Sequence, residues 1–394
     1  MTQTWGITER ARTSRLPSLT SLRFISALLV FLFHASCTTP PWTFFGDPAQ
    51  ASAFSTVAAD AGRIGVAFFF ILSGFVLTWS SDSVGDVLDF WRRRLVKVFP
   101  NHLVTWALAL VLFGGGTAAA GTVLANLFLL HPWVPDYDTF LSVNVPSWSL
   151  GCELLFYLAF PVLFPLIKRI PAARLWATAI GLIAAVFAVA FVAQFLVPTE
   201  PGLPEANSPG SVWQFWLVYF LPPVRALDFA LGIVLARIVL SGRWIGLGFG
   251  TAALLTAGGY VLASFVPWVF HLNAVTIIPL ALLIPAAACA DIRGGRSPLR
   301  GRFAVWLGEI SFAFYMVHAL VLSGTRALLG PDAYFGFWAA SGVVLAELVV
   351  SVLGAWLLYT TVERPIMRRF GRRRPPAAPG APEGSVPAEP VPAK

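Results

Sequence analysis

Long apolar runs separated by short polar stretches constrain the fold of this chain more than any other feature. Hydrophobic residues make up 57% of the 394 positions and charged residues only 12%, which is about half the charged fraction of a soluble globular domain. Apolar runs of about 20 residues are long enough to cross the hydrocarbon layer of a membrane as helices. We therefore expect an all-α, polytopic integral membrane protein that is surrounded by a lipid bilayer.

The apolar runs predict about ten transmembrane helices. They fall at residues 19–36, 64–80, 102–113, 149–167, 175–197, 222–240, 245–266, 274–290, 303–323 and 337–360. The stretch between about 114 and 147 is either a further crossing or a short re-entrant or interfacial segment. With a single crossing in residues 98–147, the basic clusters share one side and the acidic loop 198–212 lies on the other. We therefore expect a re-entrant or interfacial segment, with both termini in the cytoplasm.

The chain divides into three expected regions. Residues 1–17 are a cytoplasmic N-terminal arm, residues 18–370 are the transmembrane domain, and residues 371–394 are a disordered Pro/Ala-rich cytoplasmic tail. The formal net charge of +8 comes from clusters between the apolar runs, which is typical of membrane orientation. We therefore expect a protein of the cell membrane and no nucleic-acid partner. The three cysteines are too scattered for a metal site or a disulfide framework.

The first apolar run contains two polar residues whose presence in a membrane span requires an explanation. Arg23 lies near one end of LTSLRFISALLVFLFHAS and His34 near the other. An arginine in mid-membrane costs about 2.5 to 3.5 kcal/mol on insertion scales, so a polar pair in a span indicates a functional site. Eleven residues are about three helical turns, which puts both side chains on one face and about 16 Å apart along the axis.

Further polar residues predict two clusters at different depths. Arg92, Arg93, Arg94 and Lys97 form a basic cluster at the inner surface, whereas Glu153 and His34 are expected in the outer half. Guanidinium groups suit a polyphosphate ligand, and an imidazole beside a carboxylate suits proton abstraction from a hydroxyl group. Together they suggest group transfer through the membrane. The secondary site candidates are Ser73, Trp148, Tyr157, Arg225, Asp228 and His318.

Structural roles explain many of these residues equally well. The basic cluster is needed as an orientation anchor even without a ligand, and His34 or His318 can bond a neighbouring helix. Arg225 and Asp228 are spaced to pair within one helix. Glu153 has no obvious local cation, so we expect a more distant partner for it.

Six motifs in order resemble the acyltransferase family 3 of integral membrane O-acyltransferases. They are Arg23 with His34 after ten intervening residues, FFFILSGF at 68–75, FWRRRLVKVFP at 90–100, PSWSLGCELLFY at 146–157, LGEISFAFYMVH at 307–318 and VERPIMRR at 362–369. The resemblance runs from about residue 16 to residue 369. The SLTSLRF start and the compact size look like the branch that acylates macrolide or other antibiotic sugars.

The resemblance implies transfer of an acyl group, commonly acetyl, from a cytoplasmic acyl-CoA to a hydroxyl of a sugar, polysaccharide or glycosylated natural product. The family's Arg and His match Arg23 and His34, its acidic residue matches Glu153, and its basic motif matches Arg92, Arg93 and Lys97. These residues imply a catalytic group of His34, Glu153 and Arg23, and binding of the acyl-CoA co-substrate by Arg92, Arg93 and Lys97. No tightly bound cofactor and no metal are expected.

This sequence departs from the family pattern in three places, and other functions stay open. Lys97 stands where the family usually has arginine, Asn101 with His102 follow the proline where an aromatic is common, and Gly151 with Cys152 replace a more usual pair. No esterase-like domain is expected after the last span, so the membrane unit would act alone or with a separate partner. One alternative function is an exporter of a glycosylated product that uses an intramembrane proton relay, although no repeat is visible. Another is a non-catalytic scaffold.

Overall fold

The computed structural model describes residues 16–38, 42–81, 83–114, 119–204 and 209–371. The expected N-terminal arm and the expected disordered tail lie almost entirely outside these residues. Within them the chain is helical and forms no sheet, since its extended contacts are two isolated bridges, Phe45 with Phe335 and Gly202 with Ser211.

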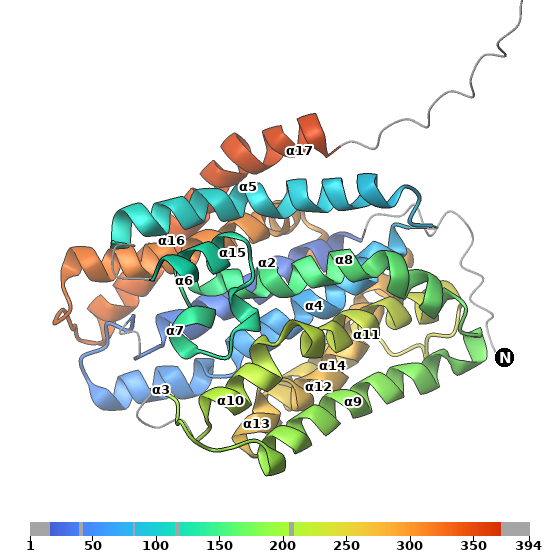
Figure 1. Cartoon of the computed structure of the whole chain (residues 1–394), viewed down its shortest axis with the longest axis horizontal. Coiled ribbons are helices and arrows are strands. Elements are labelled where there is room, and N and C mark those ends of the chain that lie inside the picture. Colours follow the sequence, from blue (N-terminus) through green and yellow to red (C-terminus); the bar gives the residue numbers. More distant parts are fainter. Residues whose placement is uncertain (1–15, 39–41, 82, 115–118, 205–208, 372–394) are drawn as a thin grey trace, which may run out of the picture.

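Among the described residues, ten long helices form the bundle, whose arrangement Figure 1 shows. They are α2 (Pro17–Ala35), α4 (Ala61–Trp79), α5 (Val87–Phe113), α8 (Trp148–Lys168), α9 (Leu175–Leu196), α11 (Pro222–Leu240), α12 (Phe249–Ala263), α14 (Ala274–Ile292), α15 (Arg302–Leu329) and α16 (Phe337–Leu358). Among the described residues, eight helical segments are long and apolar enough to cross a membrane, and α12 is a shorter apolar helix. α11 has 19 residues and carries three charged side chains. The prediction of an all-α polytopic membrane protein is confirmed.

Shorter elements connect these helices. They are α3 (Pro48–Ala58), η3 (Ala172–Arg174), α10 (Val212–Phe215), α13 (Trp268–His271), η5 (Pro298–Arg300) and α17 (Arg364–Phe370), together with two π-helical turns, η4 (Trp216–Phe220) and η6 (Tyr359–Glu363). Figure 1 shows α17 lying along α5 at the edge of the bundle. π-helical turns inside α-helices are frequent at functional sites.

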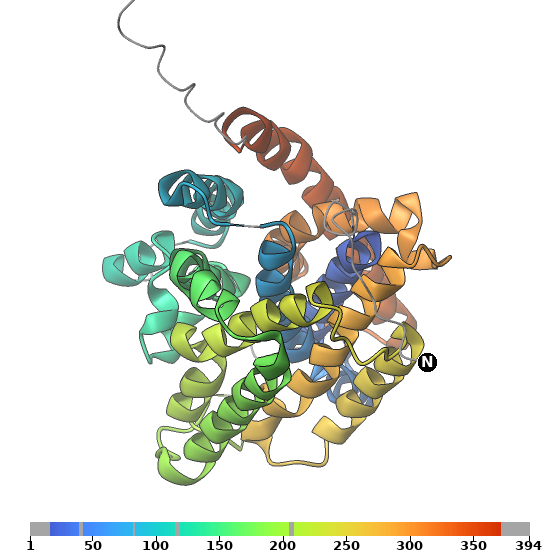
Figure 2. The same ribbon diagram turned by 90° about the vertical axis from the view of Figure 1, so that its right-hand side faces the viewer.

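The centre of the bundle is built from α2, α4, α11 and α15. α4 packs against α2 and α11, and α2 packs against α15, and Figure 2 shows α2 and α4 enclosed by the later helices. Two glycines allow the closest of these contacts. A Cβ atom on Gly74 would lie 2.0 Å from the Phe229 carbonyl oxygen, and one on Gly232 would lie 1.9 Å from that of Ile71. Only glycine leaves the necessary room at these two positions.

The two ends of the bundle differ in charge. Ser18 at the start of α2 bonds Asp291 at the end of α14, and Arg92 near the start of α5 bonds the Phe370 carbonyl oxygen of α17. We call this the basic end, because the Arg92–Lys97 cluster lies there. The other end, which contains Ala35 and Gly114, is called the opposite end.

α5 is longer than the sequence pattern predicts. The basic motif at 90–100 and the apolar run at 102–113 were expected as separate pieces, but one helix of 27 residues contains both and continues through Pro100. It ends where Gly114 adopts a left-handed backbone with φ of 69°, a conformation that glycine adopts at little cost. The basic side chains therefore lie on the same rigid helix as the apolar crossing.

The segment from 119 to 147 folds back into the bundle instead of crossing it. Its elements are α6 (Ala120–Leu127), η1 (His131–Trp133), α7 (Tyr137–Phe140) and η2 (Val145–Ser147), each too short to span a membrane. Near its end, Asn144 donates from Nδ2 to the Met316 carbonyl oxygen in the middle of α15, 3.0 Å away. The expectation of a short re-entrant or interfacial segment instead of a further crossing is confirmed for the described residues 119–147. One consequence is that α8 begins deep in the bundle.

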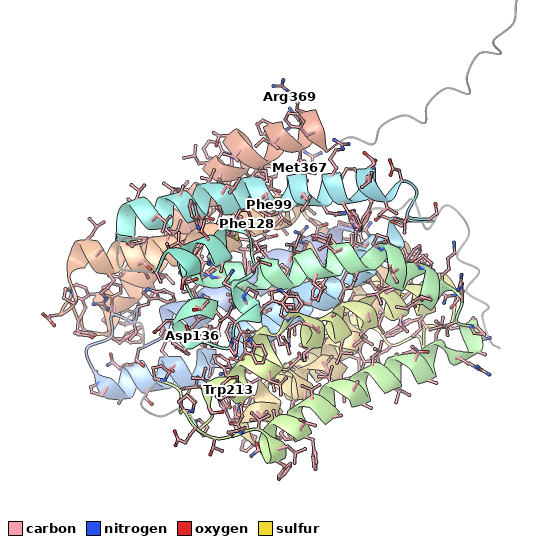
Figure 3. All side chains as sticks on the ribbon, viewed as in Figure 1. Phe99, Phe128, Asp136, Trp213, Met367 and Arg369 are labelled. Atoms are coloured by element: carbon pink, nitrogen blue, oxygen red, sulfur yellow. The ribbon has the colours of Figure 1, made fainter. Side chains whose placement is uncertain are left out.

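Apolar side chains cover much of the outside of the molecule. Figure 3 shows side chains projecting outward from every outer helix, and among them Phe128 and Trp213 are 56% and 40% exposed. In two outer segments, Ala172–Leu196 and Phe337–Phe370, only 22% of the most apolar stretch is buried. An apolar outer surface of this extent is expected for helices that contact lipid.

Candidate active site

Two cavities lie inside the bundle, one beside Arg23 and one beside His34. The first, called the Arg23 cavity, has an empty volume of about 550 Å³. The second, called the His34 cavity, has about 690 Å³. Val66 and Tyr315 line both cavities, so the two spaces lie next to each other.

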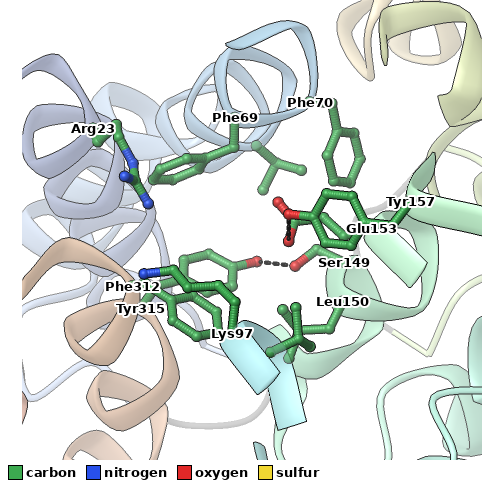
Figure 4. A pocket seen from close by; sticks show the side chains of 12 residues that line it. Arg23, Phe69, Phe70, Lys97, Ser149, Leu150, Glu153, Tyr157, Phe312 and Tyr315 are labelled. Atoms are coloured by element: carbon green, nitrogen blue, oxygen red, sulfur yellow. Dashed lines mark hydrogen bonds between the residues drawn. The ribbon is translucent and has the colours of Figure 1, made fainter. Parts of the chain in front are cut away.

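Charged side chains face each other across the Arg23 cavity. Figure 4 shows the nitrogen atoms of Arg23 and Lys97 on one side, with the carboxylate of Glu153 and the hydroxyl of Tyr157 on the other. They come from three helices: α2, α5 and α8. The remaining wall is mostly aromatic and aliphatic, with Phe69, Phe70, Val98, Leu150 and Phe312. The arrangement offers two cations to an anionic ligand in an otherwise apolar surrounding.

Glu153 is held by hydroxyl groups rather than by a direct ion pair. Tyr157, one turn along α8, donates its hydroxyl to Oε2 of Glu153 over 3.1 Å, and Ser73 of α4 hydrogen-bonds the same tyrosine. Three cations, Arg23, Lys97 and Arg94, act on its carboxylate through space. They belong to α2 and α5, so the charges that influence Glu153 come from helices other than its own.

Lys97 is positioned by a carboxylate from the far end of the chain. Its Nζ lies 2.5 Å from Oε1 of Glu363, and Asn101 donates from Nδ2 to the other carboxylate oxygen of Glu363 over 2.7 Å. Glu363 is 2% exposed and belongs to η6, the π-helical turn that follows α16. The closing VERP motif thus fixes the lysine that lines the Arg23 cavity.

Arg92 and Arg93 do not line this cavity. Arg92 donates to Asp89 and Arg93 forms an ion pair with the same residue, both within the first turns of α5. The resemblance implied that Arg92, Arg93 and Lys97 bind the acyl-CoA together. Lys97 lines the cavity, but Arg92 and Arg93 lie closer to the start of α5, where both pair with Asp89. The basic neighbour of Glu153 and Tyr157 is instead Arg94, whose guanidinium lies 5.9 Å from the Tyr157 ring centre.

His34 forms a direct pair with His318. Nδ1 of His34 and Nε2 of His318 are 2.8 Å apart, and the two rings are stacked with their centres 5.1 Å apart. Nδ1 of His318 lies 3.3 Å from the Phe314 carbonyl oxygen, which can only accept, so this nitrogen carries a proton. Nε2 of His318 then accepts a hydrogen bond from the protonated Nδ1 of His34. In this arrangement Nε2 of His34 keeps a free lone pair and is the base of the pair.

Glu153 does not contact His34, so the expected orienting contact between them is wrong. Both residues were assigned to one outer cluster on the assumption that α8 begins at the membrane surface. The fold-back segment ends in mid-bundle, where Tyr315 donates to Oγ of Ser149 over 3.0 Å. Glu153, one turn further along α8, therefore reaches the level of Arg23. His318 supplies the orienting contact to His34.

Aromatic rings form most of the wall of the His34 cavity. The lining includes Phe33, Trp42, Tyr137, Trp148, Phe215, Tyr219 and Phe220, and its charged member is Arg63. Trp148 is packed between Tyr219 and Phe220, with ring centres 4.8 Å and 4.6 Å away. Arg63 is held by Asp60 at 2.7 Å, which leaves the cavity with little net charge. Such a wall suits the apolar faces of a sugar or of a larger hydroxylated ring.

Arg225 and Asp228 form the expected pair within α11. Nη2 of Arg225 lies 2.9 Å from Oδ2 of Asp228, and both side chains are fully buried. The Arg225 guanidinium lies 5.0 Å from the centre of Phe70 and 5.5 Å from that of Tyr219, rings that line the Arg23 cavity and the His34 cavity respectively. The pair lines neither cavity. It supports the aromatic wall between them.

Three further residues shape the two cavities, although they were not among the site candidates from the sequence. They are Glu363, Ser149 and Tyr315. Each lies inside one of the family motifs, but a sequence motif does not reveal which other helices its residues contact. Gly151 was also missed as a packing residue: a Cβ atom there would lie 2.6 Å from the Leu129 carbonyl oxygen. The departure at WSLGCE therefore accommodates the fold-back segment.

Comparison with known proteins assigns a family. The model of a family described as an acyltransferase domain matches residues 16–360. Acyltransferase MdmB of Streptomyces mycarofaciens is 43% identical over 381 residues, which cover 93% of this chain and 95% of that protein. No solved structure matches the chain significantly.

Two more distant relatives are named for exopolysaccharide production and for peptidoglycan O-acetylation. The exopolysaccharide production protein ExoZ of Rhizobium meliloti (strain 1021) is 26% identical over 325 residues, covering 79% of this chain and 92% of that protein. The putative peptidoglycan O-acetyltransferase YrhL of Bacillus subtilis (strain 168) is 24% identical over 399 residues. The match covers 91% of this chain but only 56% of YrhL.

Proposed function

This chain belongs to acyltransferase family 3, and from that premise we propose that it is a membrane O-acyltransferase with acyl-CoA as its donor. The group transferred is commonly acetyl, and the acceptor is a hydroxyl group of a sugar, a polysaccharide or a glycosylated natural product. The similarity to acyltransferase MdmB over nearly the whole of both chains favours the branch that acylates macrolide or other antibiotic sugars. The observation that carries the proposal is the paired imidazole of His34 in a cavity adjacent to a cationic one.

The donor is assigned to the Arg23 cavity. Arg23 and Lys97 would contact phosphate oxygens of acyl-CoA, since charged donors make short and strong hydrogen bonds to phosphate. The Glu363 carboxylate holds Lys97 in place, and the acyl end would extend along the apolar wall toward Tyr315. Arg92 and Arg93, at the start of the same helix, are left for attraction of the anionic donor toward the basic end.

The acceptor is assigned to the His34 cavity. Nε2 of His34 takes the hydroxyl proton while the acceptor oxygen forms a bond to the acyl carbonyl carbon. The bond from that carbon to the CoA sulfur breaks, and the thiolate leaves with the proton that His34 returns. His318 keeps His34 in the required tautomer through its Nε2, much as a carboxylate does in other acyl-transfer sites.

The orientation of the bundle follows from its charges. Among the described residues, every Arg and Lys lies toward the basic end except Arg63, Arg225 and Arg326. Asp47, Asp136, Asp138, Glu200 and Asp332 lie at the opposite end. Positive charge remains on the cytoplasmic side of membrane proteins, so we assign the basic end and both termini to the cytoplasm. The donor cavity then opens toward the compartment that contains acyl-CoA.

Acyl transfer by the purified protein tests this function. The full chain in lipid nanodiscs is given acetyl-CoA with isotope-labelled acetyl groups and a panel of glycosylated macrolides, and products are identified by mass spectrometry. The wild type should add one acetyl mass to an acceptor, and His34→Gln should lower the rate about 100-fold or more, the usual contribution of a general base. His271→Gln, which changes a histidine that lines neither cavity, is the matched control and should stay close to wild type.

Two results would contradict this proposal. Full transfer by His34→Gln would remove the assigned base, because no other imidazole lines the cavity among the described residues. Movement of a glycosylated product across vesicles without any dependence on acyl-CoA would instead favour an exporter.

A further inference from the structure

The two cavities meet at Tyr315, and we propose that this tyrosine is a positioning residue that keeps water in the acceptor cavity away from the donor thioester. The inference rests on the proposed acyl-CoA-dependent function. Tyr315 and Val66 are common to the walls of both cavities. Val66 is an aliphatic side chain packed in α4, with 3% of its surface exposed. Tyr315 is therefore the polar group at the boundary.

Three contacts fix the Tyr315 side chain in place. Its hydroxyl donates to Oγ of Ser149 over 3.0 Å. Its ring meets Phe69 edge-on with the centres 5.8 Å apart, and the His318 ring lies 5.8 Å away on the other side. Tyr315 is 6% exposed. The ring thus joins α4, α8 and α15 at the level where the cavities adjoin.

Ser149 can hold only one arrangement of this hydrogen bond. Its hydroxyl donates to the Pro146 carbonyl oxygen over 3.0 Å, and a hydroxyl has a single proton. Its oxygen must therefore accept from Tyr315 rather than donate to it. Because Pro146 belongs to η2, the end of the fold-back segment is tied through Ser149 to the tyrosine at the boundary.

A closed boundary matters because water competes with the acceptor. When no acceptor is bound, a water molecule in the His34 cavity can lose a proton to Nε2 of His34 and attack the thioester carbonyl carbon. A carbon–oxygen bond forms, the carbon–sulfur bond breaks, and the products are the free acid and CoA with its thiol proton. Exclusion of water from a reactive intermediate is a recognised function of closed sites. The Tyr315–Ser149 bond supplies this closure.

Hydrolysis of acetyl-CoA without an acceptor tests the proposal. The full chain in nanodiscs is given acetyl-CoA alone, and release of the free thiol is followed over time. Loss of one buried hydrogen bond should loosen the boundary, so Tyr315→Phe should raise acceptor-independent hydrolysis about fivefold. The affinity for acetyl-CoA, measured by equilibrium binding, should stay within about twofold, because the hydroxyl makes no assigned contact to phosphate.

Ser149→Ala removes the same hydrogen bond from the other helix and provides a second variant. Its hydrolysis should rise by a similar factor, and Tyr315→Phe combined with Ser149→Ala should exceed neither single variant, since both remove one bond. Tyr260→Phe is the matched control: its hydroxyl bonds the Val57 carbonyl oxygen, and it lines neither cavity. It should hydrolyse acetyl-CoA at the wild-type rate.

The outcomes separate this inference from the proposed function. Acetyl-CoA binding by the wild type, together with unchanged hydrolysis in both Tyr315→Phe and Ser149→Ala, would overturn the boundary role alone. Additive effects of the two substitutions would also overturn it, because they would show that the residues act independently. A wild-type protein that neither binds nor consumes acetyl-CoA would refute the donor itself, and this assignment with it.

Discussion

The Arg23 cavity and the His34 cavity are neighbours with opposite chemical character. The first presents Arg23, Lys97 and Glu153 in its wall, whereas the second is lined mostly by aromatic rings around a histidine pair. Charged side chains are thus concentrated in the Arg23 cavity, which is assigned to the anionic donor. They are sparse in the His34 cavity, where the hydroxyl proton is to be transferred. Binding energy from a remote, non-reacting part of a substrate can position the reacting atoms in this way.

The supporting contacts of the two cavities have a similar range but differ in kind. Lys97 depends on Glu363, 266 residues away in the sequence, through an ion pair. His34 depends on His318, 284 residues away, through a neutral hydrogen bond. In both cases a residue near the C-terminal end of the bundle positions one from the first half. Removal of these partners should therefore separate donor binding from the chemical step.

The largest effect is expected from the histidine pair. His318→Leu removes the acceptor for Nδ1 of His34, so His34 loses its fixed tautomer, and kcat should fall about 100-fold, near the low end of a general-base contribution. The KM for acetyl-CoA should stay within about twofold. Steady-state kinetics with an identified acceptor provides both values.

His318→Gln is the conservative counterpart. The glutamine side-chain oxygen can accept the same hydrogen bond from Nδ1 of His34. The kcat of this variant should therefore be about tenfold higher than that of His318→Leu. Equal loss in the leucine and glutamine variants would assign His318 a packing role instead.

A smaller and different effect is expected at Arg23. Arg23→Gln removes a charged donor from the Arg23 cavity, so the KM for acetyl-CoA should rise about tenfold, as for a hydrogen bond to a charged group. The value of kcat should change little. Arg23→Lys keeps the charge, so its KM for acetyl-CoA should lie between those of the wild type and Arg23→Gln. If Arg23→Gln lowers kcat while KM is unchanged, the division of tasks between the cavities is wrong.

The smallest effect is expected from Arg92 and Arg93. Both are paired with Asp89 outside the cavity wall, and partly exposed ion pairs contribute little. Arg92→Gln and Arg93→Gln should each change the KM for acetyl-CoA by less than about twofold at physiological salt. A change as large as that of Arg23→Gln would place these arginines on the donor after all.

The sequence predicted the helices, because apolar length reports directly on membrane helices. Arg23, Glu153, Lys97 and His34 all lie in cavity walls, as a functional-site interpretation expects. Their grouping was less predictable. Helical periodicity places residues along one helix, but it gives no depth for a helix that begins inside the protein.

The misplacement of Glu153 shows this limit most clearly. α8 was assumed to begin at the membrane surface. It instead begins directly after η2, at the level of Met316 in α15, whose carbonyl oxygen accepts a hydrogen bond from Asn144. The pairing of His34 with His318 was equally inaccessible, since it depends on the packing of α2 against α15. Only the isolated, buried nature of each histidine could be inferred from its surrounding sequence.

The position of a bound donor tests the central claim most directly. A structure of the full chain in nanodiscs with a non-hydrolysable acetyl-CoA analogue should show phosphate density beside Arg23 and Lys97, with the acetyl end at Tyr315. Density for the analogue in the aromatic cavity beside His34, without contact to Arg23 or Lys97, would contradict the assignment of donor and acceptor to separate cavities.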